Sequence, residues 1–198
     1  MNSGTQPVEG APKGKSLATL WILLAVCVSP FLASFLLYTY APPKSRVNYG
    51  ELVEPVPLVS FEATLTDGRP LGLGELKGKW TFVQVDGPDC SPTCVEKLYS
   101  MRQVRIAQGK NMDRVQRLWL LDGDGPINSD LLKAYEGTLI AHEGKRRLAV
   151  QLPVATAVRD HIWIIDPLGN VMMRYPAHAD PSGIKKDMER LLKVSQID

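Results

Sequence analysis

Two of the chain's three cysteines, Cys90 and Cys94, are separated by three residues in the segment DGPDCSPTCVEKL. Such a thiol pair can exchange electrons as a disulfide, or its two thiolates can hold one soft metal ion. A disulfide scaffold needs more cysteines, and a structural zinc site needs more ligands. The spacing therefore indicates redox or soft-metal chemistry.

The pair is predicted to stand at the junction between an apolar strand and a helix. Ser91 is a suitable N-cap and Pro92 a suitable first helical residue, which places Cys94 near the third helical position. A helix N-terminus carries about half a positive charge and so favours thiolate over thiol. Because Cys90 precedes the helix, the two sulfurs can still meet, so a reversible disulfide is expected. Three intervening residues also suit two thiolates on one soft ion.

A second segment, from Ser16 to Tyr40, contains no charged residue. A helix of about 20 apolar residues crosses the hydrocarbon core of a membrane. A cleaved signal peptide is the alternative, but its apolar region is usually only about 7–15 residues long. We therefore predict a tail over residues 1–15, a retained membrane-spanning helix over 16–40 and a linker over 41–50. The extramembrane domain then covers residues 51–198.

The charge balance and the N-terminal composition restrict partner and location. A formal net charge of +2 gives no electrostatic reason to expect nucleic-acid binding. The first 45 residues contain no Arg, which argues against a mitochondrial transit peptide. The prediction is a bacterial inner-membrane protein with a single span and a cytoplasmic tail.

Strand and helix patterns in the large domain alternate in a recognisable order. They predict an α/β, thioredoxin-like fold with an N-terminal hairpin extension, preceded by a single transmembrane helix. The predicted elements are a hairpin turning at Asp67-Gly68, a strand over 80–85, a helix from Ser91 to Gly109, a strand over 115–122, a helix over 128–142, a hairpin over 161–176 and a helix after Asp180.

Three segments of the domain resemble the Sco/SenC family of copper-binding, thioredoxin-like assembly factors. They are DGRPLGLGELKGKWTFVQVDGPDCSPTC, LWLLDGDG and DHIWIIDPLGNVMMRYP. The resemblance implies that Cys90, Cys94 and His161 are copper ligands in a domain that faces the periplasm. It also implies cytochrome c oxidase subunit II as the partner, and it lets Asp122 stand for the family's acidic residue. Of the other histidines, His142 and His178 are expected at the surface.

Three functions stay open from the sequence. The leading one is a membrane-anchored copper metallochaperone that assists assembly of the copper site of cytochrome c oxidase. The second is a periplasmic thiol–disulfide oxidoreductase that uses Cys90 and Cys94 on cysteines of a respiratory partner. The third is a non-catalytic assembly protein whose cysteine pair is a structural disulfide. His161 separates the first two, because thiol exchange does not need an imidazole.

Overall fold

The computed structural model describes residues 17–40, 48–153 and 157–195 of the chain. Contacts divide the chain into two compact units, Met1–Arg46 and Val47–Asp198. Of the described elements, one helix belongs to the first unit, and all of the strands and the other helices belong to the second.

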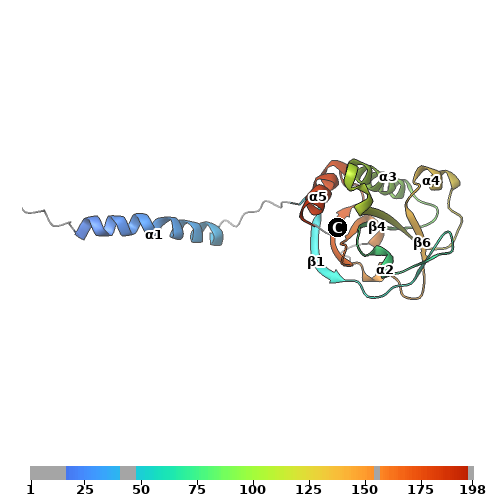
Figure 1. Cartoon of the computed structure of the whole chain (residues 1–198), viewed down its shortest axis with the longest axis horizontal. Helices are drawn as coiled ribbons and strands as arrows, with labels where there is room; N and C mark the ends of the chain where they lie inside the picture. Colours follow the sequence, from blue (N-terminus) through green and yellow to red (C-terminus); the bar gives the residue numbers. More distant parts are fainter. Residues whose placement is uncertain (1–16, 41–47, 154–156, 196–198) are drawn as a thin grey trace, which may run out of the picture. The chain divides into compact units, whose positions relative to one another are not determined.

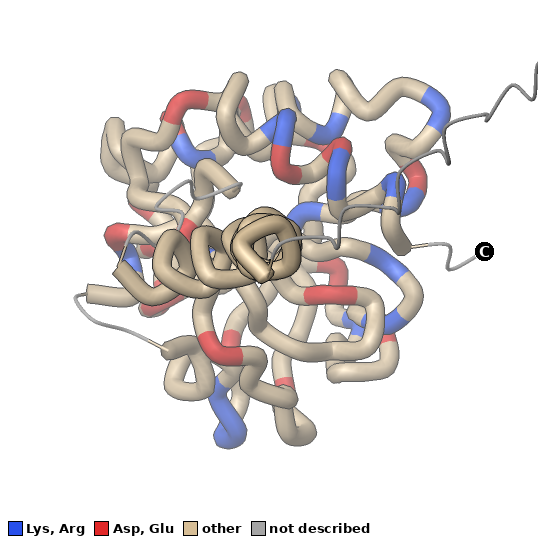
Figure 2. The backbone as a smooth tube through the Cα atoms, turned by 90° about the vertical axis from the view of Figure 1, so that its left-hand side faces the viewer, with Lys and Arg blue, Asp and Glu red and all other residues tan. Residues whose placement is uncertain are grey.

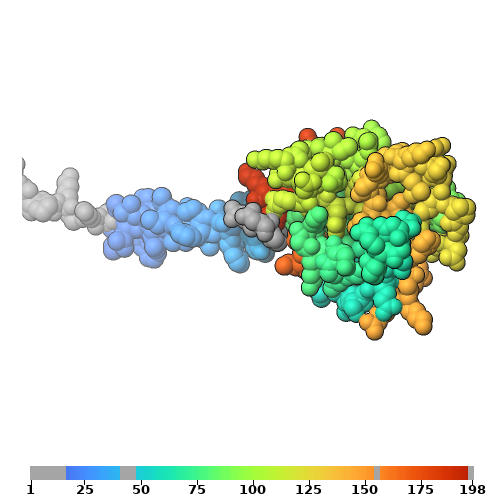
Figure 3. All heavy atoms as spheres, turned by 45° about the vertical axis from the view of Figure 1, so that its right-hand side comes forward, coloured from blue at the N-terminus to red at the C-terminus, as the bar shows by residue number. Residues whose placement is uncertain are grey.

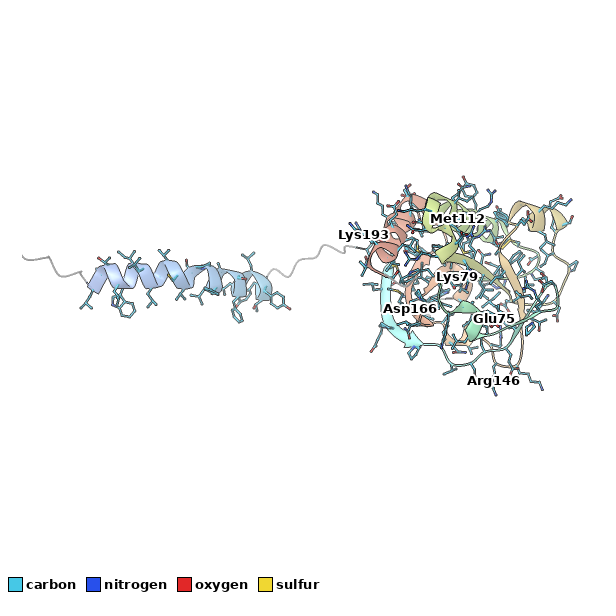
Figure 4. The ribbon with its side chains drawn as sticks, in the orientation of Figure 1. Glu75, Lys79, Met112, Arg146, Asp166 and Lys193 are labelled. Carbon is cyan, nitrogen blue, oxygen red and sulfur yellow. A yellow bond between two sulfur atoms is a disulfide. The ribbon has the colours of Figure 1, made fainter. Side chains whose placement is uncertain are left out.

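The helix of the first unit, α1, runs from Leu17 to Tyr40 and contains Pro30. Its 24 residues span about 36 Å at 1.5 Å per residue, more than the roughly 30 Å of a bilayer's hydrocarbon core. It carries no charged residue, as Figure 2 shows, and its side chains project on all sides (Figure 4). Its mean hydropathy reaches 2.4, and it is the one helix in the described ranges that is long and apolar enough to cross a membrane.

In the second unit, the described residues form one eight-stranded sheet with the order β1-β8-β7-β4-β5-β6-β2-β3. The central strands β4, β5 and β6 are parallel, and the other neighbouring pairs are antiparallel. The carboxyl ends of the three strands β4, β5 and β6 therefore lie side by side at the same end of the sheet. The strands are β1 (Glu51–Pro57), β2 (Ala63–Leu65), β3 (Pro70–Leu71), β4 (Trp80–Asp86), β5 (Val115–Leu121), β6 (Leu139–Glu143), β7 (His161–Ile165) and β8 (Asn170–Pro176).

Helices cover the two faces of the sheet unequally. Helices α3 (Pro92–Ala107) and α5 (Pro181–Val194) lie on one face, and the short α2 (Leu73–Leu76) lies on the other, as Figure 1 shows. Side chains alternate along β4, so Phe82 packs in the cluster with α3 and α5, whereas Val83 packs in the cluster with α2. We call these the α3 face and the α2 face.

Most of the predicted elements are confirmed. The hairpin at Asp67-Gly68 is β2 and β3, the strand–helix–strand unit is β4, α3 and β5, and the second hairpin is β7 and β8. Asp180 caps α5 by accepting a hydrogen bond from the backbone N–H of Ser182.

The helix predicted over 128–142 is wrong in its second half. Helix α4 covers only Ser129–Ala134, and the chain then forms strand β6 beside β5. Gly137 adopts a φ of +77°, which ends the helical course, and the following strand buries Ile140 and Ala141. Burial against the sheet thus outweighs the helical preference of this segment.

Strand β1 was not predicted, and it is fixed to the domain through a buried carboxylate. Asp187 on α5 is 1% exposed and accepts hydrogen bonds from the backbone N–H groups of Tyr49 (3.0 Å) and Gly50 (2.8 Å). The hydroxyl of Tyr175 donates a third, at 3.2 Å. These bonds hold the start of β1 against β8 and α5.

Candidate functional site

The cysteine pair forms a disulfide at the carboxyl end of β4, with a Cα–Cα distance of 5.2 Å between Cys90 and Cys94. The backbone N–H of Cys90 donates to the carbonyl of Gly87 at 3.1 Å and closes a turn. Cys90 has a φ of +40°, and it is the one non-glycine residue with positive φ in the described part of the chain. The left-handed backbone conformation of Cys90 turns the chain from β4 into α3.

The predicted helix start is confirmed, and it sets the position of Cys94. Ser91 is the N-cap, with Pro92 at the first helical position, and the Ser91 hydroxyl accepts from the backbone N–H of Cys94 at 3.3 Å. The positive end of the α3 dipole therefore lies at the cysteine pair, which stabilises a thiolate there.

The two sulfurs differ in their surroundings. Cys94 is fully buried, and Cys90 is 7% exposed. The side-chain amide of Gln84 on β4 donates to the Cys94 sulfur at 3.4 Å. Cys90 is therefore the more exposed of the two cysteines, and Cys94 is the one whose sulfur accepts a hydrogen bond from the domain interior.

A buried ion pair lies on the same face of the sheet. Asp86 is two residues after Gln84 on β4, and its Oδ2 atom is 2.6 Å from Nζ of Lys97. Lys97, one helical turn after Cys94, is fully buried and also donates to the carbonyl of Arg159 at 2.6 Å. Burial raises the pKa of Asp86 and lowers the pKa of Lys97, because each charged form loses its hydration.

His161 begins β7 and points away from this cluster. Its ring centroid lies 5.3 Å from that of Trp163, which packs on the α2 face, whereas both cysteines pack on the α3 face. Its Nδ1 atom lies 3.4 Å from the carbonyl oxygen of Ala157. No three His, Cys, Asp or Glu side chains converge as a metal-binding group among the residues that the structure describes. The structure therefore does not bring His161 together with Cys90 and Cys94.

The other titratable residues that the sequence singled out lie elsewhere. Asp122 follows β5, and its Oδ2 atom is 2.9 Å from Nη2 of Arg159. His178 is exposed, with Nδ1 at 2.7 Å from Oε2 of Glu96. His142 lies in β6 rather than at a helix end, and it lines a cavity next to Asp122.

Sequence reasoning missed three residues of the site: Gln84, Asp86 and Lys97. A signal was present, because the mainly apolar strand WTFVQVD carries Gln84 and Asp86 at alternate positions. In a strand buried on both faces, two polar side chains on one face need partners there. Lys97, three residues after Cys94 on the helix, is at the spacing that reaches the same face.

One known protein family matches most of the large domain. Residues 80–195 match the family described as transmembrane-like, thioredoxin-like, C-terminal domain. No curated protein sequence matches the chain.

Solved structures with a similar fold include Sco proteins and thioredoxin-like proteins. Yeast Sco1 with copper bound has a TM-score of 0.57 at 15% identity, covering 72% of this chain and 96% of that one. A SCO1/SenC family lipoprotein from Bacillus anthracis has a TM-score of 0.51 at 22% identity, covering 71% and 99%. A putative thioredoxin from Neisseria meningitidis has a TM-score of 0.55 at 17% identity, covering 71% and 92%. At these identities the comparison shows the fold, and the predicted thioredoxin-like fold is confirmed.

Proposed function

Because the chain belongs to the family of transmembrane-like, thioredoxin-like C-terminal domains, we propose that it is a membrane-anchored thiol–disulfide exchange protein. One observation carries the proposal: the disulfide between Cys90 and Cys94 lies at the N-terminus of α3, where Cys90 keeps 7% exposure and Cys94 has none. Asymmetry of this kind gives the exchange reaction a defined order.

The proposed reaction begins with a partner thiolate that attacks the Cys90 sulfur. The Cys90–Cys94 bond breaks, a mixed disulfide forms between the partner and Cys90, and Cys94 leaves as a thiolate. A second partner thiolate then attacks the partner's own sulfur in the mixed disulfide and releases Cys90. The partner's two cysteines are oxidised to a disulfide, and Cys90 and Cys94 are reduced. The reverse sequence reduces a partner disulfide.

Buried polar groups on the α3 face support the leaving thiolate. The amide of Gln84 donates to the Cys94 sulfur, and the helix dipole adds positive potential at the same atom. Asp86, whose pKa burial raises, lies on the same face of β4 two residues after Gln84. Lys97 holds the Asp86 carboxylate in place at 2.6 Å.

A redox titration of the full-length protein in detergent micelles tests this function. We expect one two-electron transition, assigned to Cys90 and Cys94 by alkylation and mass spectrometry. Its potential should lie between about −270 and −120 mV, the range of thiol-exchange proteins. A potential below about −300 mV would favour the structural disulfide of a non-catalytic assembly protein instead.

The proposed location of the domain is the periplasm, with α1 as the anchor in a bacterial inner membrane. The disulfide between Cys90 and Cys94 fits an oxidising compartment, and α1 has the length and composition of a membrane span. A C-terminal fusion to alkaline phosphatase should be active, whereas a fusion to a reporter that works only in the cytoplasm should be inactive. The opposite pattern would contradict the proposed orientation.

A second candidate function is delivery of copper to subunit II of cytochrome c oxidase. The fold that the domain shares with copper-bound Sco1 favours it. When Cys90 and Cys94 are reduced, their two thiolates suit copper(I). His161 as a third ligand stays a prediction, and it requires the start of β7 to rearrange, because the imidazole now lies beside Trp163.

Copper loading of the reduced full-length protein tests the second candidate. Delivery predicts one copper(I) per chain, lost when Cys90 and Cys94 are both replaced by Ser. If His161 is a ligand, His161→Ala should weaken copper(II) binding and remove its sulfur-to-copper absorption while copper(I) is better retained. A reduced protein that binds no copper would leave thiol exchange as the function. Transfer to the isolated copper domain of subunit II would identify that partner.

A further inference from the structure

A polar cavity opens at the carboxyl ends of β5 and β6, at the end of the sheet that also carries the disulfide. Its volume is about 270 Å³. The segments that form it belong to the yellow and orange part of the domain in Figure 3. The lining residues are Leu121, Asp122, Gly123, Asp124, His142, Glu143, Gly144 and Arg147.

The loop after β5 joins this cavity to the turn that bears Cys90. The backbone N–H of Asp122 donates to the carbonyl of Asp86 at 3.0 Å. Gly125 lies against Pro88, since a side-chain carbon at Gly125 would be 3.1 Å from the proline ring. A partner segment engaged at Cys90 therefore passes close to this loop.

Several charges of the lining are already compensated inside the domain. Arg147 lies 2.9 Å from a Glu143 carboxylate oxygen and 3.5 Å from Asp122. The other oxygen of Glu143 accepts from the backbone N–H of Ala149 at 2.7 Å. Asp122 is also held by Arg159. These groups form a fixed wall and have little capacity for a new ionic partner.

Two lining side chains, Asp124 and His142, have no hydrogen bond or ion pair with any other described residue. Of the three lining carboxylates, Asp122 and Glu143 form ion pairs with Arg147 or Arg159, and Asp124 is the one with no ion pair to another described residue. The described residues form no group of three metal-binding side chains, which favours an organic cation over a metal ion.

We propose that this cavity receives a Lys or Arg side chain of the partner segment whose cysteine reacts at Cys90. The inference rests on the proposed thiol exchange and adds a substrate class to it: a cysteine flanked by a basic residue. Asp124, in the loop after β5, supplies the charge, and His142, on the neighbouring strand β6, supplies a hydrogen-bonding group. An exposed pair of this kind contributes about 0.2–1 kcal/mol, equivalent to a roughly 1.5- to 5-fold preference.

Peptide binding to the full-length protein in detergent micelles tests the cavity without any redox step. The peptides have equal length, carry Ser in place of Cys, and differ only in a flanking Lys, Arg, Gln or Glu. The Lys and Arg peptides should bind about 2- to 5-fold more tightly than the Glu peptide, and added salt should remove the difference. Asp124→Asn should abolish the preference. The matched control Glu54→Gln, an exposed acid on β1 at the other side of the sheet, should leave it intact.

Equal affinities for all of the peptides, or a preference that survives Asp124→Asn, would overturn the proposal. The proposed function is tested separately with dithiothreitol, which carries no charge to recognise. If dithiothreitol reduces the disulfide but the peptides show no charge preference, the cavity proposal fails and the function stands. If the basic peptides are preferred but no thiol reduces the disulfide, the function fails and the cavity remains a binding site.

Discussion

The two faces of the central sheet differ in what they bury. The α3 face holds the cysteine pair together with the buried side chains of Gln84, Asp86 and Lys97. The α2 face is packed mainly by aliphatic side chains and Trp163, and the half-buried His161 lies at its margin.

This difference indicates that the α3 face carries the reactive groups and that the α2 face mainly provides apolar packing. Burying an ion pair costs more hydration energy than a hydrophobic pair would, so it gives little reason to expect stability alone. We propose that the buried Asp86–Lys97 pair, whose lysine is one helical turn after Cys94, serves the reactivity of the cysteine pair. Among the described residues, the ion pairs toward the α2 face, Glu143 with Arg147 and Arg174 with Glu51, each keep one partner in solvent, and this face supports β4 from behind. The contrast can be tested by substitutions on each face.

The largest expected effect belongs to Lys97→Met on the α3 face. The change leaves the Asp86 carboxylate buried without its partner, and we expect the free energy of unfolding at neutral pH to fall by about 3–5 kcal/mol. Urea unfolding of the full-length protein in micelles measures it. The double variant Asp86→Leu with Lys97→Met should recover most of the loss, because both charges are then removed.

The same variant should show a pH dependence of defined sign. Burial raises the pKa of Asp86 in the folded state, and without Lys97 only the smaller effect of the Arg159 charge opposes that shift. The unfolded carboxyl titrates at about 4. Because the folded state binds the proton more tightly, the stability of Lys97→Met should be best below pH about 4 and decline as the pH rises through the raised pKa. A loss of stability independent of pH would show that Asp86 is not the cause.

Leu120→Ala provides the comparison on the α2 face. Leu120 is fully buried in the aliphatic cluster, so its truncation should cost about 2–4 kcal/mol at every pH. Thiol exchange by the remaining folded protein, followed by the rate of disulfide reduction, should change less than about twofold. A large loss of exchange rate here would mean that the two faces are not functionally distinct.

Gln84→Leu is expected to act on reactivity more than on stability. It removes the donor to the Cys94 sulfur while keeping a similar volume. A hydrogen bond is worth about 1 kcal/mol, so reduction of the disulfide should slow by about fivefold. The matched control is Thr81→Val on the α2 face of the same strand, where the hydroxyl accepts from Gln116 and does not face the sulfur. Equal effects of the two changes would contradict a specific role for Gln84.

The smallest expected effect is that of His161→Ala on thiol exchange. The imidazole lies beside Trp163, so the reduction rate and the potential of the cysteine pair should stay within about twofold and 10 mV of the unchanged protein. A larger change would place His161 near the sulfurs in solution and would strengthen the copper-delivery candidate.

The sequence predicted the elements whose local signals agree with their tertiary environment. Ser91 and Pro92 mark the start of α3, and Asp180 marks that of α5, because capping is a local interaction. Strand β6 was missed because its pairing with β5 decides its conformation, and no local pattern encodes that pairing.

The candidate site, like the fold, was predicted where local sequence signals are enough and missed where tertiary contacts decide. Cys90 and Cys94 were recognisable because their spacing and helix position define the disulfide. Lys97 could not be identified as their neighbour until the helix face was known, since a lysine in a helix is usually solvated. The sequence correctly placed His161 at the start of a strand. The face of β7 on which its ring lies could not be predicted, because that face depends on the register of strand pairing.

The central claim is that exchange proceeds through the Cys90 sulfur, and trapping the mixed disulfide tests it most directly. Reduced Cys94→Ser and Cys90→Ser proteins are each mixed with a peptide disulfide, and mixed-disulfide formation is followed by mass spectrometry. Cys94→Ser, which keeps the more exposed thiol, should form the mixed disulfide at least about tenfold faster than Cys90→Ser. Equal rates, a reversed order, or no mixed disulfide in either variant would contradict the proposed function.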